Sequence, residues 1–315
     1  MTGVAPVEGD PGLLSLLGDG RPLFTLFGLA LAAFGGVALF LGATGQFLPH
    51  DTAFLGMTAQ QLCNVHGCRV VHFMIHDRVS FGGVLIAIGF TYVWLSEFAL
   101  RRGEGWAWWA FLASGSAGFV SFLAYLGYGY LDTWHGVATL AILPLFAAAL
   151  LLTRSLRSRG TALPPVEWVT RGGRGRTLLL AATLGMIAAG LTIMTLGASW
   201  VFVPQDLEFM GVTRADLHAL NERLVPLIAH DRAGFGGALV SCGIAMFSTV
   251  LYGRPSRSLW QALAGAGLAG FSTAIGVHPL IGYTSVTHLA PAVFGCAVYA
   301  VGLAWTRPET SRGPR

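Results

Sequence analysis

Eight hydrophobic runs separated by polar segments succeed one another along the chain, and this pattern predicts a membrane protein of the all-α class. An α-helix needs about 20 apolar residues to cross a bilayer. The runs that satisfy this length span residues 23–45, 79–99, 105–128, 133–154, 177–200, 233–252, 259–281 and 284–305. We therefore predict eight transmembrane helices.

The polar segments between the runs predict the orientation. Arginines dominate the segments after the second, fourth and sixth runs and the C-terminal tail, whereas the segments after the first and fifth runs carry mixed charge. Cytoplasmic segments of membrane proteins carry the excess of basic residues. The chain is thus expected to be a multi-pass protein of the plasma membrane, with both termini in the cytoplasm.

A polar motif that opens the second apolar run returns in the sixth. His-Asp-Arg, followed by Phe-Gly-Gly, occupies residues 76–83 and again residues 230–237. Each copy is followed by a lone histidine at the start of a later run, His135 and His288, at intervals of 59 and 58 residues from the motif histidines. The two halves therefore carry the same histidine pattern.

The similarity between the halves extends beyond the histidines. Gly129-Tyr130 returns as Gly282-Tyr283, and Pro49 and Asp51 return as Pro204 and Asp206. We predict an internal duplication that forms two tandem four-helix bundles. The predicted divisions are a cytoplasmic segment 1–21, a first bundle 22–154 with outer loop 46–75, an arginine-rich linker 155–176, a second bundle 177–305 with outer loop 201–229, and a tail 306–315.

Paired histidines at one depth of a helical bundle indicate a metal cofactor, because two imidazoles can ligate one heme iron from opposite sides. The second and fourth spans of a half begin on the same side of the membrane, so their histidines can meet. The predicted ligand pairs are His76 with His135 and His230 with His288. Further cofactor contacts are expected from Arg78 and Arg232 to propionates and from a porphyrin slot at Gly83 and Gly237. The alternatives are interfacial histidines and glycines that serve only close helix packing.

Composition supports the membrane assignment and excludes a nucleic-acid partner. Apolar residues make up 54% of the chain and charged residues only 11%, and the mean hydropathy is +0.64. The net charge of +4 comes from arginine alone. In a membrane protein such an excess sets topology, so the expected partner is the lipid bilayer, together with a quinone or a heme substrate.

These features resemble heme A synthase over residues 22–305: eight spans, and a histidine in the second and fourth span of each half. The resemblance implies oxidation of a heme methyl group in the first half, a b-type heme in the second, and the four histidines named above as ligands. The family glutamate three residues before the first motif histidine is Phe73 here, so Asp51, Asp77 or His72 could take over its acid–base role, beside His76 and His135.

The first outer loop also contains Cys63 and Cys68, which resemble a cysteine pair of that family. On an outward loop they are expected to form a disulfide, the alternative being a soft-metal site with His66 or His50.

Two other functions remain open at this point. His72 and His76, four residues apart, could hold zinc or copper together with aspartates and His135, as in an intramembrane hydrolase. The chain could instead be a b-type cytochrome that carries electrons from a quinone.

Overall fold

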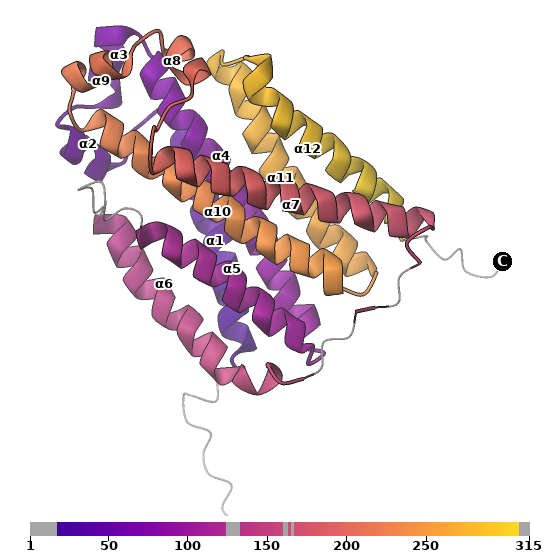
Figure 1. Cartoon of the computed structure of the whole chain (residues 1–315). Helices are drawn as coiled ribbons and strands as arrows, with labels where there is room; N and C mark the ends of the chain where they lie inside the picture. Colours follow the sequence, from indigo (N-terminus) through magenta and orange to yellow (C-terminus); the bar gives the residue numbers. More distant parts are fainter. Residues whose placement is uncertain (1–17, 124–132, 160–162, 165–166, 309–315) are drawn as a thin grey trace, which may run out of the picture.

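The structure is a computed structural model, which describes residues 18–123, 133–159, 163–164 and 167–308 (Figure 1). Within these ranges the chain forms helices and no strand, so the all-α prediction is confirmed. The long helices are α1 (Arg21–Thr44), α4 (Arg69–Trp94), α5 (Gly105–Leu123), α6 (Thr133–Leu152), α7 (Arg171–Gly197), α10 (Leu224–Tyr252), α11 (Arg257–Ile281) and α12 (Val286–Trp305). The shorter ones are α2 (Pro49–Leu55), α3 (Ala59–His66), α8 (Pro204–Met210) and α9 (Arg214–Leu220), together with a π-helical turn η2 (Leu95–Leu100) and a 3₁₀ turn η4 (Arg154–Leu156).

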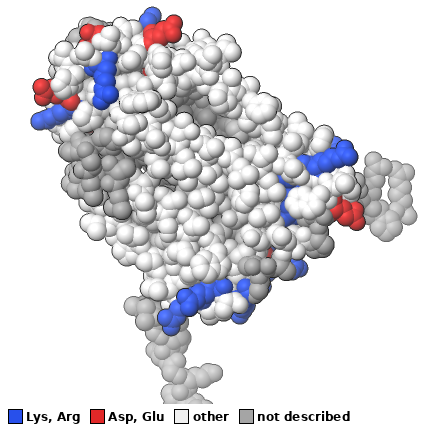
Figure 2. All heavy atoms as spheres, viewed as in Figure 1, with Lys and Arg blue, Asp and Glu red and all other residues white. Residues whose placement is uncertain are grey.

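Six of the described helices are long and apolar enough to cross a membrane. They are α1, α4 with its continuation to Leu100, α7, α10, α11 and α12. Figure 2 shows the matching surface, an uncharged belt between two ends where the charged side chains gather. The length of these apolar helices and the position of the uncharged belt identify the chain as a membrane protein.

Helices α4 and α10 are the most buried of these spans and form the centre of the molecule. Helix α4 packs along α1 and α11, whereas α10 packs along α7 and α5, and the two central helices contact each other. The third long helix of each half thus packs against the central helix of the other half. Buried residues from both halves form one continuous core, so the expected division into two separate bundles does not describe the packing.

The four short helices gather at one end of the molecule (upper left in Figure 1). Helices α2 and α8 both begin with proline and both end at a glycine with positive φ, 68° at Gly56 and 70° at Gly211. Thr58 and Thr213 then cap the N-termini of α3 and α9 with their side chains. The same local signals therefore give both outer segments the same helix–turn–helix form, and a second buried cluster lies beneath them.

Helices α4 and α10 begin about ten residues earlier than the apolar runs predict, at Arg69 and Leu224 instead of residues 79 and 233. The repeated motif consequently lies inside each helix, not at its start. The reason is that the polar residues of the motif find partners within the protein, so the helix continues through them without exposing them to lipid.

Candidate metal centre and adjoining pocket

Arg78, on α4, is held by two carboxylates, one from the short helix α2 and one from α10. Its Nη1 lies 2.7 Å from Asp51 Oδ2 and its Nε lies 2.9 Å from Asp231 Oδ2. Asp51 is fixed because it also accepts a hydrogen bond from the Leu48 amide at the start of α2. One partner thus comes from the same half of the chain, and the other comes from α10.

Arg232, on α10, makes the corresponding contacts. Its Nη1 lies 2.6 Å from Asp206 Oδ2, and its Nε lies 3.3 Å from Asp77 Oδ2. Asp206 in turn accepts a hydrogen bond from the Val203 amide at the start of α8. The two arginines therefore tie the central helices to each other and each outer segment to its own central helix.

Each motif aspartate also binds the histidine that precedes it. His76 Nδ1 lies 3.0 Å from Asp77 Oδ1, and His230 Nδ1 lies 3.1 Å from Asp231 Oδ1. A carboxylate at Nδ1 fixes the orientation of an imidazole ring and directs Nε2 to the other side. Both motif histidines are thus oriented in the way that metal-ligating histidines usually are.

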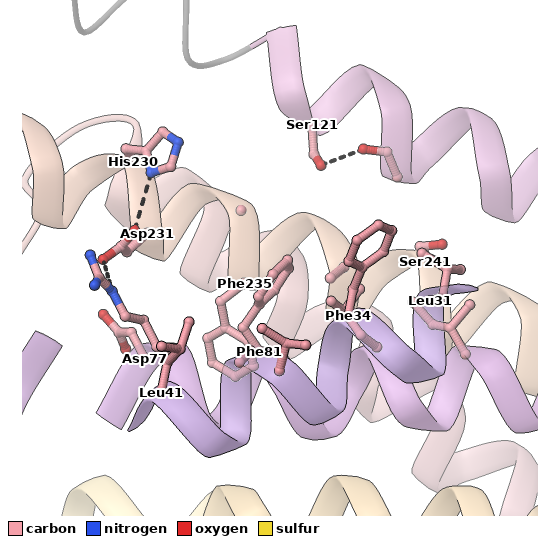
Figure 3. A pocket seen from close by; sticks show the side chains of 18 of the residues that line it. Leu31, Phe34, Leu41, Asp77, Phe81, Ser121, His230, Asp231, Phe235 and Ser241 are labelled. Atoms are coloured by element: carbon pink, nitrogen blue, oxygen red, sulfur yellow. Dashed lines mark hydrogen bonds and ion pairs between the residues drawn. The ribbon is translucent and has the colours of Figure 1, made fainter. Parts of the chain in front are cut away.

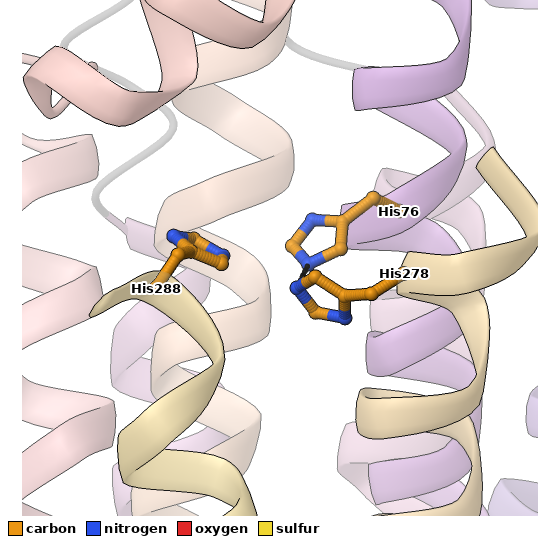
Figure 4. Close-up of side chains that lie close together, drawn as sticks. All are labelled: His76, His278 and His288. Carbon is orange, nitrogen blue, oxygen red and sulfur yellow. Dashed lines mark hydrogen bonds between the residues drawn. The ribbon is translucent and has the colours of Figure 1, made fainter. Parts of the chain in front are cut away.

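Three histidines from three helices meet beside α4. Figure 4 shows His76 of α4, His278 of α11 and His288 of α12 facing one another. The Nε2 atoms of His76 and His278 are 3.1 Å apart, and one nitrogen from each of the three rings lies within 4.8 Å of the others. His76 is 5% exposed and His278 is 4% exposed. Within the described ranges of the chain, this is the group of three or more such side chains close enough to hold one metal ion.

Tyr283, in the turn between α11 and α12, supports the third histidine. Its hydroxyl donates to Asp206 Oδ1 at 2.7 Å and lies 3.1 Å from His288 Nδ1. Burial and the Asp206 carboxylate raise the pKa of the Tyr283 phenol, so the hydroxyl stays protonated. The Nδ1 atom of His288 is therefore engaged, which leaves Nε2 of this ring for a ligand.

An apolar pocket of about 270 Å³ lies on the opposite side of α4, among α1, α4, α5, α6 and α10. Figure 3 shows its two ends, one with His230, Asp231 and Asp77 and the other with apolar side chains such as Leu31. Asp77 lines this pocket and also binds His76 of the histidine cluster. A single carboxylate thus connects the two sites.

The structure brings the predicted site residues together differently from the expectation. The described partners of His76 are His278 and His288, which come from the other half of the chain. The predicted pairing of His230 with His288 is replaced by this cluster, since His288 faces His76. The side chain of His135 lies outside the described residues, so its predicted contact with His76 stays a prediction.

The glycines and arginines predicted to bind a cofactor have other roles. A side-chain carbon at Gly83 would overlap Thr273 of α11, and one at Gly237 would overlap Ser121 of α5. Both glycines therefore serve close helix packing, the alternative interpretation, and no porphyrin slot exists at either position. Both arginines are already bound by carboxylates, as described above.

Asp51 and Asp77, predicted to be catalytic, are each 2% exposed and each pair with an arginine. Their first role is therefore to neutralise buried guanidinium groups. The predicted zinc cluster of the first half is not formed as expected, because the group around His76 contains His278 and His288 in place of His72.

The predicted disulfide is confirmed. Cys63, on α3, and Cys68, just before α4, are joined with an S–S distance of 2.11 Å. The predicted alternative, a soft-metal site at these cysteines, is thus excluded in this structure. The bond closes the turn between the two helices.

Two site residues, His278 and Tyr283, escaped the sequence analysis. His278 lies near the end of α11 just before Pro279 and has no histidine counterpart in the first half, where Tyr125 occupies the corresponding position. A search for repeated residues could not find it. Tyr283 was visible as part of the repeated Gly-Tyr pair, a signal that indicated a shared turn but not a partner for a histidine.

The chain matches no protein-family model, no curated protein and no solved structure.

Proposed function

We propose that the chain is a metal-dependent oxidoreductase of the plasma membrane, with one copper ion bound by His76, His278 and His288. The observation that carries the proposal is the meeting of three imidazoles from three helices. Imidazole ligands suit copper and zinc, and nitrogen sites generally bind copper most tightly among the first-row divalent ions. The ion would supply one-electron chemistry, and three protein ligands leave a coordination position open.

The distances support a single ion. Two nitrogens bound to one tetrahedral metal at about 2.0–2.1 Å each lie about 3.3 Å apart. The measured separation of the His76 and His278 Nε2 atoms is 3.1 Å. A small adjustment of either ring therefore gives the geometry of neighbouring ligands.

The charges beside the cluster support a cation. Arg232 is shared by the carboxylates of Asp77 and Asp206, so one negative charge remains if all three groups are ionised. An uncompensated charge buried in a membrane protein is costly. A metal ion held by neutral imidazoles a few ångströms away would balance it.

Heme fits these residues less well. Two axial imidazoles at about 2 Å from one iron are about 4 Å apart with a flat ring between them, whereas His76 and His278 are within hydrogen-bond distance. The positions predicted to leave a porphyrin slot are filled by Thr273 and Ser121. The resemblance to heme A synthase therefore supports the proposed scaffold more than it supports heme at this cluster.

The proposed scaffold has eight crossings, related by an internal duplication, with both termini in the cytoplasm. Helices α5 and α6 lie alongside the six apolar spans and are 19 and 20 residues long. The matching bounds and caps of α2–α3 and α8–α9 support the duplication. The disulfide at the end opposite the arginine-rich segments supports an oxidising outer side.

Metal analysis of the purified protein tests the proposal. We expect about one copper ion per chain, falling below about one tenth in His278→Ala and in His288→Ala. His218→Ala is the matched control, because His218 is an exposed histidine on α9. Each variant should retain its elution volume and melting temperature, so that a lost ion is not a lost fold.

Three outcomes would contradict the proposal. Absence of copper after loading, or the same copper content in the His288 variant as in the unaltered protein, would remove the site. Stoichiometric zinc in place of copper would replace the oxidoreductase with a hydrolase. A porphyrin in a pyridine extract, lost together with His76, would restore the heme assignment.

A further inference from the structure

The pocket beside α4 is long and narrow. Its wall on α1 runs from Phe27 to Gly42, which corresponds to about 22 Å of helix at 1.5 Å per residue. Its volume is only about 270 Å³. A long and narrow apolar pocket fits one hydrocarbon or isoprenoid tail better than a compact ligand.

The pocket also reaches the outer surface of the helix bundle. Phe34 and Val37 line it and are 46% and 55% exposed. Both lie on α1, within the apolar belt. A ligand dissolved in the bilayer can therefore enter sideways from the lipid.

The polar end of the pocket limits the charge of the ligand. Asp51 and Asp231 share the one guanidinium of Arg78, and His230 lies against Asp231. Three carboxylates, those of Asp51, Asp77 and Asp231, line this end with the guanidinium of Arg78, so a carboxylate or phosphate head group is disfavoured there. A group that donates hydrogen bonds is favoured there.

Aromatic side chains separate this polar end from the rest of the pocket. Phe81 and Phe235, the phenylalanines of the two repeated motifs, both line the pocket, and Figure 3 shows them between the end with Asp77 and Asp231 and the end with Leu31. Phenylalanine rings pack favourably on a flat aromatic ligand. The order along the pocket is therefore carboxylates, aromatic rings and an apolar channel.

We propose that this pocket binds a quinol, with its hydroxyl groups donating to the Asp231 end, its ring against Phe81 and Phe235, and its isoprenoid tail along α1. A simple amine would leave the apolar channel empty, and a fatty acid would fill the channel but place a carboxylate beside Asp51 and Asp231. The proposal goes beyond the metal site, since different residues form the pocket. It also gives Asp77 a place between the ligand and His76.

A binding measurement on the full-length protein in neutral-lipid nanodiscs tests the proposal. The probes are a benzoquinol with a decyl tail, the same compound oxidised to the quinone, and decanoate. Hydrogen bonds to a charged acceptor are worth about 1.5–3 kcal/mol, so we expect the quinol to bind about tenfold or more tighter than the quinone. Decanoate should bind more weakly still.

Two variants separate the pocket from the surface of the same helix. Leu31→Trp fills the channel and should weaken quinol binding about tenfold or more. Leu29→Trp makes the same change on the exposed side of α1, where Leu29 is 55% exposed, and should leave binding unchanged. Metal content is measured in the same samples. A protein that binds quinol without metal, or metal without quinol, then shows which of the two proposals has failed.

Equal binding of quinol and quinone would overturn the proposal, as would preference for decanoate or an unaltered affinity in Leu31→Trp. Solvent extraction of the purified protein provides a second measurement. Co-purification of an isoprenoid quinone is expected, whereas stoichiometric phospholipid or porphyrin in the pocket would assign it to another ligand.

Discussion

Two sites lie on opposite sides of α4, the histidine cluster and the apolar pocket. Both adjoin arginine–aspartate contacts of the repeated motif, but they enclose different side chains. On one side, His76 meets two histidines supplied by α11 and α12. On the other, the pocket that reaches His230 continues as an apolar channel along α1. The arginine–aspartate contacts are alike on both sides. The difference teaches that the repeated motif builds the frame on both sides, while the histidine cluster is completed by His278, a residue that the repeat does not supply.

Loss of an arginine should affect the histidine side most. Arg232→Ala leaves Asp77 and Asp206 buried without their guanidinium partner, and we expect about 3–5 kcal/mol of lost stability. Arg78→Ala should cost less, about 2 kcal/mol, because the Arg78 side chain is 16% exposed and Arg232 only 7%. Unfolding in mixed detergent micelles measures both changes.

A surface arginine provides the control for that comparison. The Arg254 side chain is 76% exposed, so Arg254→Ala should change the free energy of unfolding by less than about 0.5 kcal/mol. Equal losses of stability in Arg78→Ala and Arg232→Ala would show that the two arginines are equally shielded from solvent, contrary to the difference in their exposed fractions.

The close helix contacts should respond alike on both sides. Gly83→Ala forces a carbon against Thr273, and Gly237→Ala forces one against Ser121. Each should lower stability by about 1–3 kcal/mol through overpacking. Gly185→Ala, which meets no atom within 4 Å, is the control and should be neutral or slightly stabilising. Thermal melting of the three variants distinguishes a packing role from a ligand slot, which would tolerate alanine.

The smallest expected effect on stability comes from Tyr283, the tyrosine of the histidine cluster. Tyr283→Phe removes the hydroxyl that joins Asp206 to His288, and should lower stability by about 1 kcal/mol. The same change should weaken metal binding about 10–100-fold, since outer partners orient the ligands. Quinol binding on the other side of α4 should stay the same, and a parallel loss there would show that the two sites are not separate.

The helical architecture and the disulfide could be predicted from the sequence, because hydrophobic run length and an outward cysteine pair are local signals. The bounds of α4 and α10 could not, because their polar first turns are stabilised by contacts from distant segments. Asp51 and Asp206 illustrate this point. In the sequence they were visible only as a repeated pair, and only the fold shows that each binds an arginine of a central helix.

The structure places two of the predicted ligand histidines, His76 and His288, in one cluster, together with His278, which was not predicted. His76 and His288 were recognised by their repetition, but repetition suggested that ligands pair within a half. The structure brings His76 to histidines of the other half because α11, which carries His278, packs on α4, and α12, which carries His288, packs on α11. His278 breaks the repeat and therefore gave no signal.

The ion pairs that join α4 to α10 have a consequence for biogenesis. Asp77 enters the membrane with the first helices to be synthesised, yet its guanidinium partner arrives only when the ribosome has reached Arg232. Until then the carboxylate of Asp77 lacks the guanidinium that binds it in the folded protein. The ion pair that neutralises Asp77 can therefore form only after α10 has been synthesised.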